Sequence, residues 1–236
     1  MFDTESPKQV LEKLRSFNSK ERFFMVGYIL GNPDFKPSQT FVEKIENILN
    51  LKFPKELFTA MDYHIDWLYA GLYLAFYEGQ KNIYPNDEEL ITGSQEDIDF
   101  IIAFVQNNYC HIILIEVKGV MEWANKQLHS KALRLGKIFG QKGDRWPSIV
   151  PHFLMMSPKK SKNVDVFDCP RWMTLKGEIP WVELSVPNEL YKVTRCDDNG
   201  HANKDGAFWR PEFRKNCGNS HRQAACGIDT QLIFTR

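Results

Sequence analysis

Between Asp97 and Lys118 the chain contains two nearly continuous apolar runs, which flank the dipeptide Asn107-Asn108. Both runs are rich in β-branched and aromatic residues, and the two asparagines between them suit a tight turn. This pattern predicts a β-hairpin. Both faces of the two predicted strands are apolar, which is typical of strands that are buried on both sides.

The predicted turn also sets the register of the hairpin, and that register places Asp99 opposite Glu116 and Asp97 opposite Lys118. Because side chains alternate between faces, Asp99, Glu116 and Lys118 share one face. Two carboxylates about 5 Å apart repel each other, and burial of either charge is costly unless it is paired. A divalent cation would relieve both costs, since hard cations prefer carboxylate oxygens. We therefore expect a metal site here, with Lys118 placed to orient a water or to stabilise developing negative charge.

Helical periodicity dominates the chain before this hairpin. Residues 6–17, 20–30 and 38–49 each combine a capping residue or proline with apolar positions three to four residues apart. We expect these three helices to form an N-terminal subdomain that spans residues 1–54. A longer and largely buried helix is expected over residues 55–79.

The pattern after the hairpin predicts a helix over residues 122–139 and a core strand over residues 148–156. Pro151 lies within that strand, so we expect an edge or a bulge at this position. Residues 181–186 have the composition of a further short strand. The fold class is therefore α/β, and we expect residues 55–236 to be one α/β domain with an irregular C-terminal extension.

The composition is that of an ordinary globular protein, with 43% hydrophobic and 25% charged residues among 236. No apolar run approaches the ~20 residues of a membrane span, and the first residues do not resemble a signal peptide. The five cysteines are an odd number without framework spacing, which favours reduced thiols. We expect a cytoplasmic protein without a membrane partner, and a homodimer is one option for its oligomeric state.

Charge is distributed unevenly, although the formal net charge is zero. Residues 1–99 contain 10 Lys/Arg and 17 Asp/Glu, whereas the remaining residues contain 20 and 13. Several bases follow the hairpin closely, among them Lys126, Lys131, Arg134 and Lys137. A basic surface beside the expected metal site would suit contacts to nucleic-acid phosphates. A solvated helix face is an equally good interpretation of the same residues.

An aspartate followed, after a spacer, by Glu-x-Lys on a hairpin resembles the motif of the PD-(D/E)XK nuclease superfamily. The resemblance implies a restriction-endonuclease-like core, in which helices flank a mixed central sheet. It also implies that Asp99 and Glu116 bind Mg²⁺ or Mn²⁺ with help from the carbonyl of Val117, and that Lys118 positions the attacking water. The proline that names the motif is absent from this chain.

Two further residues fit this resemblance, which extends over about residues 61–156. Members of the superfamily often bring a glutamate from the helix before the hairpin to the metal, and Glu78 matches that position. Some members place a glutamine after the motif, and Gln127 matches it. An exposed helix end and an exposed amide are the alternative interpretations of these two residues.

The stretch from residue 196 to residue 228 interleaves bases with aromatic residues, a composition that suits nucleic-acid contact. Four side chains in it could instead supply zinc ligands: Cys196, Cys217, His221 and Cys226. Their spacing lacks any Cys-x-x-Cys pair, so we expect no structural zinc.

Taken together, these patterns predict a metal-dependent nuclease that hydrolyses phosphodiester bonds, with DNA as the expected substrate and partner. A catalytically silent module of the same fold, which binds nucleic acid or a protein, is the first alternative. The second alternative is an unrelated α/β protein in which the hairpin acids are structural.

Overall fold

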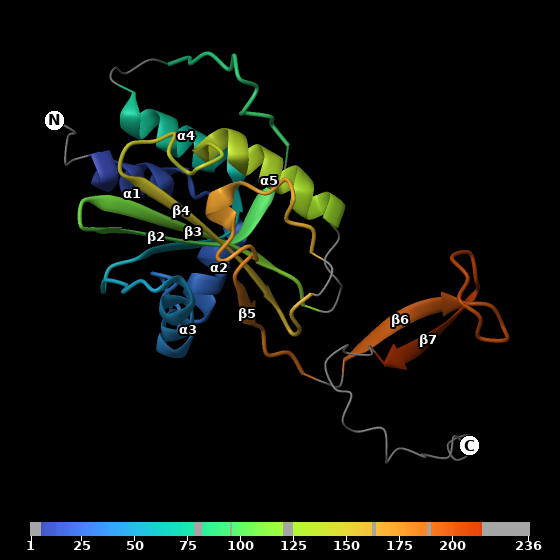
Figure 1. The fold of residues 1–236 in the computed structure, drawn as a ribbon. Coiled ribbons are helices and arrows are strands. Elements are labelled where there is room, and N and C mark those ends of the chain that lie inside the picture. Colours follow the sequence, from blue (N-terminus) through green and yellow to red (C-terminus); the bar gives the residue numbers. More distant parts are fainter. Residues whose placement is uncertain are drawn as a thin grey trace. The chain divides into compact units, whose positions relative to one another are not determined.

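The computed structural model describes residues 6–77, 82–94, 96–119, 125–161, 164–187 and 190–213. Tertiary contacts divide the chain into two units, Met1–Leu184 and Ser185–Arg236. The first unit is an α/β fold around a mixed five-stranded sheet, and the second contains a separate two-stranded sheet (Figure 1). None of the described helices is both long and apolar enough to cross a membrane.

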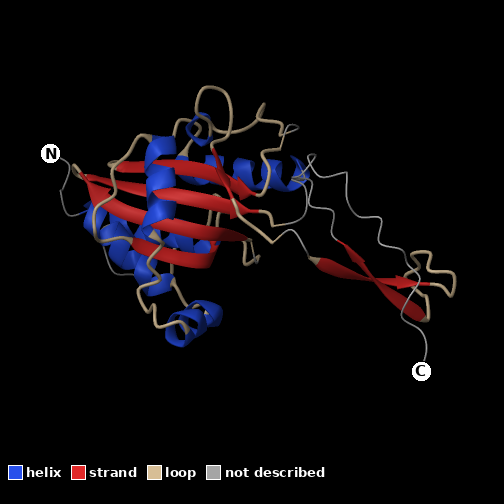
Figure 2. Cartoon of the chain, turned by 90° about the horizontal axis from the view of Figure 1, so that it is seen from below, coloured by secondary structure: helices blue, strands red, loops and turns tan. Residues whose placement is uncertain are grey.

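The central sheet has the strand order β1-β2-β3-β4-β5, and its strands lie side by side in Figure 2. The strands are β1 (Phe58–His64), β2 (Asp97–Gln106), β3 (Tyr109–Val117), β4 (Ile149–Ser157) and β5 (Trp181–Glu183). The first three form an antiparallel meander, whereas β4 runs parallel to β3 and β5 runs parallel to β4. The expected mixed sheet is thus confirmed. Strand β5 pairs only with the end of β4, so Pro151 lies where β4 is an edge on that side, as expected.

The predicted hairpin and its register are confirmed by the pairing of β2 with β3. Asn107 and Asn108 have φ values of 50° and 63°, which are the left-handed conformations that a tight two-residue turn requires. The ladder continues from the turn to the pair Phe100–Ile115. Asp99 lies one residue beyond that pair, at the open end of the hairpin.

Helices cover both faces of this sheet (Figure 1). They are α1 (Ser6–Phe17), α2 (Glu21–Ile29), α3 (Gln39–Leu49), α4 (Ile65–Phe76) and α5 (Asn125–Phe139). Apolar residues of α1, α4 and α5 pack on one face, and Ile45 of α3 packs on the other. The three predicted N-terminal helices are confirmed, and the Ser38 hydroxyl caps α3 by accepting a hydrogen bond from the N–H of Phe41. These helices belong to the same compact unit as the sheet.

The helix expected over residues 55–79 is wrong in its first half, because residues 58–64 form the strand β1. A short apolar run fits a helical stripe and a strand almost equally well, and here pairing with β2 decides between them. Asp62 interrupts that pairing with a φ of 48°, which lets both Ala60 and Tyr63 face the helical layer. The Tyr63 hydroxyl then donates a hydrogen bond to the carbonyl of Leu14 in α1 at 2.9 Å.

The second unit contains β6 (Tyr191–Cys196) and β7 (Phe208–Phe213), which pair in antiparallel fashion. In the first unit a short 3-10 helix, η1 (Arg171–Met173), precedes β5.

Candidate metal centre

A cavity of about 320 Å³ lies at the open end of the β2–β3 hairpin, beneath α5. Its polar side chains are Glu96, Asp97, Asp99, Glu116, Lys118, Gln127, Ser130 and Lys131. The structure therefore brings together four of the five predicted catalytic residues, while Glu78 lies outside the described residues. The two strands supply the carboxylates and Lys118, and one turn of α5 supplies the amide of Gln127 and the ammonium of Lys131.

Glu116 is the only acidic residue among the described residues that is almost completely buried, with 6% of its surface exposed. Burial raises its pKa to about 7, and the charge of Asp99 adds to this rise, whereas Lys131 and Lys118 oppose it. The Lys131 ammonium donates hydrogen bonds to Oε1 of Glu116 at 2.5 Å and to the carbonyl of Asp97 at 2.6 Å. Glu116 is thus a buried acid whose charge is compensated by a base from the helix above it.

Asp99 occupies the position where the regular ladder stops. Its Oδ2 accepts a hydrogen bond from the backbone N–H of Val117 at 2.6 Å. In a regular ladder that N–H would donate to the carbonyl of Ile98, so the carboxylate replaces a backbone acceptor at the strand end. A carboxylate has about four lone-pair sites, so this single bond leaves Asp99 able to bind a cation as well.

Lys118 follows directly after β3 and lines the cavity. Its backbone N–H donates to the carbonyl of Met156 at 2.8 Å, which fixes the chain at this point to β4. The expected cross-strand pair of Lys118 with Asp97 does not form a ladder contact, because the regular pairing of β2 with β3 ends at Phe100. Asp97 is instead held by Lys20 at 2.8 Å and by His64 at 2.7 Å.

The bases of α5 have different surroundings. Arg134 is nine-tenths buried, and its guanidinium bonds to Asp66, Glu96 and the carbonyl of Leu90. Lys131 is similarly buried against Glu116. Lys126 and Lys137 are exposed. The basic surface expected on this helix therefore consists of two lysines rather than four bases.

The sequence analysis places Lys131 on a basic surface and does not predict that it lines the cavity. A usable signal is present, since Lys131 follows Gln127 by four residues and so shares its helix face. The roles of Lys20 and His64 around Asp97 have no such signal, because these residues are distant from the hairpin in the sequence.

The cavity contains carboxylate oxygens, which are the donors that hard cations prefer. No group of three or more His, Cys, Asp or Glu side chains among the described residues could hold a metal ion. Asp99 and Glu116 line the cavity and would supply two carboxylates, whereas Val117, whose carbonyl the resemblance adds as an oxygen donor, is not among the lining residues. Mg²⁺ is commonly bound by one or two carboxylates and keeps several waters, so these two carboxylates suit Mg²⁺ or Mn²⁺ rather than zinc. Of the alternative zinc ligands Cys196 is buried, and Cys217, His221 and Cys226 lie outside the described residues.

When the chain is compared with known protein families, with curated proteins and with solved structures, no family, protein or structure matches it.

Proposed function

We propose that this protein is a metal-dependent nuclease that hydrolyses phosphodiester bonds in DNA and has a restriction-endonuclease-like core. The observation that carries the proposal is the presence of Asp99, Glu116, Lys118 and Gln127 around one cavity. Two carboxylates beside a lysine, at the end of a hairpin covered by a helix, provide both a cation site and a group that can act on water. The meander of three strands followed by a helix and a parallel strand supports the proposed core.

In this proposal Asp99, Glu116 and the carbonyl of Val117 would hold Mg²⁺ or Mn²⁺. When bound, the ion would neutralise charge at the scissile phosphate and lower the pKa of a water. The Lys118 ammonium orients that water by hydrogen bonding and offsets the negative charge that grows on the phosphate. The Gln127 amide, which lines the same cavity, would hold the water from the helix side.

Lys131 has a different task in this scheme. Its two hydrogen bonds hold the Glu116 carboxylate and the backbone of Asp97 in fixed positions. An acid with a pKa of about 7 is partly protonated at neutral pH, and Lys131 keeps its charged form accessible. We therefore assign Lys131 as a positioning residue for Glu116.

A second candidate is a structural role for the same acids, in a protein that is catalytically silent. The specific observation in its favour is that each carboxylate already has a partner within the chain. Asp99 accepts from the N–H of Val117, and Glu116 accepts from Lys131. Such a site needs no ligand, and it predicts no metal-dependent hydrolysis.

Cleavage of circular and linear DNA, with RNA in parallel, separates the two candidates. Wild type is compared with Lys118→Ala and with Lys142→Ala, which removes an exposed lysine outside the cavity. The nuclease predicts cleavage with Mg²⁺ or Mn²⁺ and none with chelator. It also predicts a loss of at least about 100-fold in Lys118→Ala. Lys142→Ala should cleave as wild type does. Undiminished cleavage by Lys118→Ala would refute the role of this lysine, and no cleavage by wild type would favour the silent protein.

A further inference from the structure

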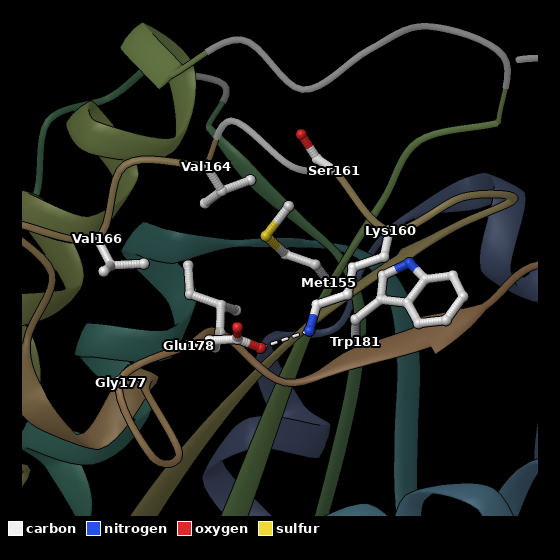
Figure 3. Close-up of a pocket in the computed structure, with 9 residues that line it drawn as sticks. Met155, Lys160, Ser161, Val164, Val166, Gly177, Glu178 and Trp181 are labelled. Carbon is white, nitrogen blue, oxygen red and sulfur yellow. Dashed lines mark hydrogen bonds and ion pairs between the residues drawn. The ribbon is translucent and has the colours of Figure 1, made fainter.

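A second cavity, of about 420 Å³, opens over β4 and β5 (Figure 3). Its apolar walls are formed by Met155, Val164, Val166, Ile179 and Trp181. Figure 3 shows the side chains of Met155, Val164 and Val166 gathered around the same space as the Trp181 indole. None of the residues proposed for catalysis lines this cavity.

The register of the sheet relates this cavity to the candidate metal centre. Glu116 of β3 is paired with Met155 of β4, and Met155 is paired with Trp181 of β5. Partners in register point their side chains to the same face, so all three lie on the face that α5 covers. Adjacent strands are about 4.8 Å apart, which puts the backbone of Trp181 about 10 Å from that of Glu116. The two cavities are therefore neighbours at the carboxyl ends of three parallel strands, where α/β sheets commonly bind ligands.

The indole of Trp181 is a wall of fixed orientation. Its N–H donates to the hydroxyl of Ser157 at 2.9 Å, and that hydroxyl donates to the carbonyl of Lys159 at 2.8 Å. These bonds use the polar edge of the ring and hold it in place. The apolar ring then serves as a preformed surface on which a flat group can stack.

A pair of opposite charges lies at the polar edge of the cavity. The Lys160 ammonium bonds to the Glu178 carboxylate at 2.5 Å, as the dashed line in Figure 3 marks. Both side chains are more than half exposed, and exposed ion pairs are weak. The pair can therefore open and present a donor and an acceptor to an incoming ligand.

We propose that this cavity binds one unpaired nucleobase of the substrate strand, beside the scissile phosphate. A base has flat apolar faces and a polar edge, which match the Trp181 and Met155 walls and the Lys160–Glu178 pair respectively. This inference rests on the proposed nuclease function and extends it. The enzyme would prefer a single strand, or a duplex site where one base can leave the stack at low cost.

Binding, measured without cleavage, tests this inference. Fluorescein-labelled single-stranded oligonucleotides are titrated with protein in chelator, and anisotropy gives the affinity. One oligonucleotide is intact, and a series of others carries a single abasic residue at successive positions. We expect abasic substitution at one position to weaken binding about tenfold, which is the typical effect of one stacked base.

Three variants locate that effect in the cavity. Trp181→Ala removes the stacking wall, and Val166→Trp fills the cavity from a partly exposed loop. Phe167→Ala is the matched control, since Phe167 is 88% exposed on the same loop and does not line the cavity. Both cavity variants should bind intact and abasic strands equally, while Phe167→Ala should keep the tenfold preference. If thermal denaturation shows that Trp181→Ala is unfolded, Val166→Trp alone carries the test.

The outcomes separate this inference from the proposed function. Two outcomes overturn the base pocket, even if the protein cleaves DNA. One is equal binding of intact and abasic strands by wild type. The other is a preference for the intact strand that survives in Val166→Trp. A base preference that both cavity variants lose supports the pocket, even if no nuclease activity is found. Binding of free deoxynucleosides is measured as a third arm. If a deoxynucleoside binds saturably while the oligonucleotides show no base preference, the cavity is a small-molecule site and the inference is overturned.

Discussion

Both faces of strands β3 and β4 carry polar side chains in apolar surroundings. The two faces differ in how the charge of these side chains is compensated. On the face beneath α5, Glu116 pairs with Lys131 at the wall of a cavity. On the opposite face, His111 and His152 stack on each other, and their ring nitrogens approach to 3.1 Å. His111 also stacks on Phe104.

The electrostatic outcome differs because the surroundings differ. The histidines have no acidic partner in these contacts, and burial lowers the pKa of both, that of His152 to about 4. They are therefore neutral at neutral pH. Glu116 has a base in contact and an open cavity beside it, so Lys131 compensates its charge, and the proposed cation would do the same. Burial without a charged partner therefore holds the two histidines neutral, whereas Glu116 is buried beside a base and a cavity, where the proposed chemistry would take place.

Substitution of Asp99 gives the largest expected effect, because Asp99 combines a structural hydrogen bond with a place at the proposed cation site. Asp99→Asn keeps an oxygen for the N–H of Val117 but removes the charge. We expect it to reduce cleavage by about 1,000-fold and to weaken Mn²⁺ binding, with stability nearly unchanged. Asp99→Ala should lose the same activity and also about 2 kcal/mol of unfolding free energy, since a hydrogen bond to a charged group is lost.

Plasmid cleavage, calorimetric Mn²⁺ binding and urea denaturation of both Asp99 variants check this prediction. Wild-type cleavage by Asp99→Asn would show that Asp99 only holds the strand end.

Lys131→Met breaks the compensated pair from the other side. It keeps an unbranched side chain that is one atom shorter, but leaves Glu116 buried without its base. We expect the unfolding free energy to fall by about 3 kcal/mol at pH 8, as for other buried pairs that lose one partner. The loss should be smaller at pH 6. Glu116 has a raised pKa, so its neutral form is the stable one in the folded protein below about pH 7.

The matched variant is the double substitution of Lys131→Met with Glu116→Gln, which removes both charges. It should recover most of the lost stability when urea denaturation is followed at both pH values. If Lys131→Met proves as stable as wild type at pH 8, the Lys131–Glu116 pair contributes nothing to the free energy of unfolding. The contrast between the charge-compensated face and the histidine face would then not hold.

The histidine face predicts a dependence on pH with the opposite sign. A histidine with a lowered pKa stabilises the fold above its ordinary pKa of about 6.5, and this stability is lost as the pH falls toward 4. One such proton changes the unfolding free energy by at most about 1.4 kcal/mol per pH unit. His152→Gln should therefore unfold with a flatter pH profile than wild type between pH 6.5 and 4. Parallel profiles for the two proteins would show that His152 is not held neutral.

Particular residues show how far the sequence can predict this molecule. Asn107 and Asn108 determine the hairpin locally, so its register and the meeting of Asp99 with Glu116 follow from the sequence alone. Strand β1 does not, because residues 58–64 become a strand only through pairing with β2. The helix face on which Lys131 lies can be predicted from its spacing in the sequence. Its contact with the buried Glu116 cannot, because that contact depends on tertiary packing. Local turn chemistry is therefore predictable, and partners across layers are not.

The smallest expected effect concerns the Lys160–Glu178 pair, which has the same chemistry as Lys131–Glu116 and the same 2.5 Å separation but lies in solvent. The pKa of Glu178 is lowered, first by its hydrogen bond to Lys160 and then by the charge of Lys160, whereas burial raises the pKa of Glu116. Solvent screens the exposed pair, and two mobile side chains lose conformational entropy when they form it. Glu178→Gln should consequently leave the urea midpoint of unfolding unchanged within error at both low and high salt. A clear, salt-dependent loss of stability would show that distance rather than burial governs the strength of these pairs, and it would remove the physical basis for the contrast with Lys131→Met.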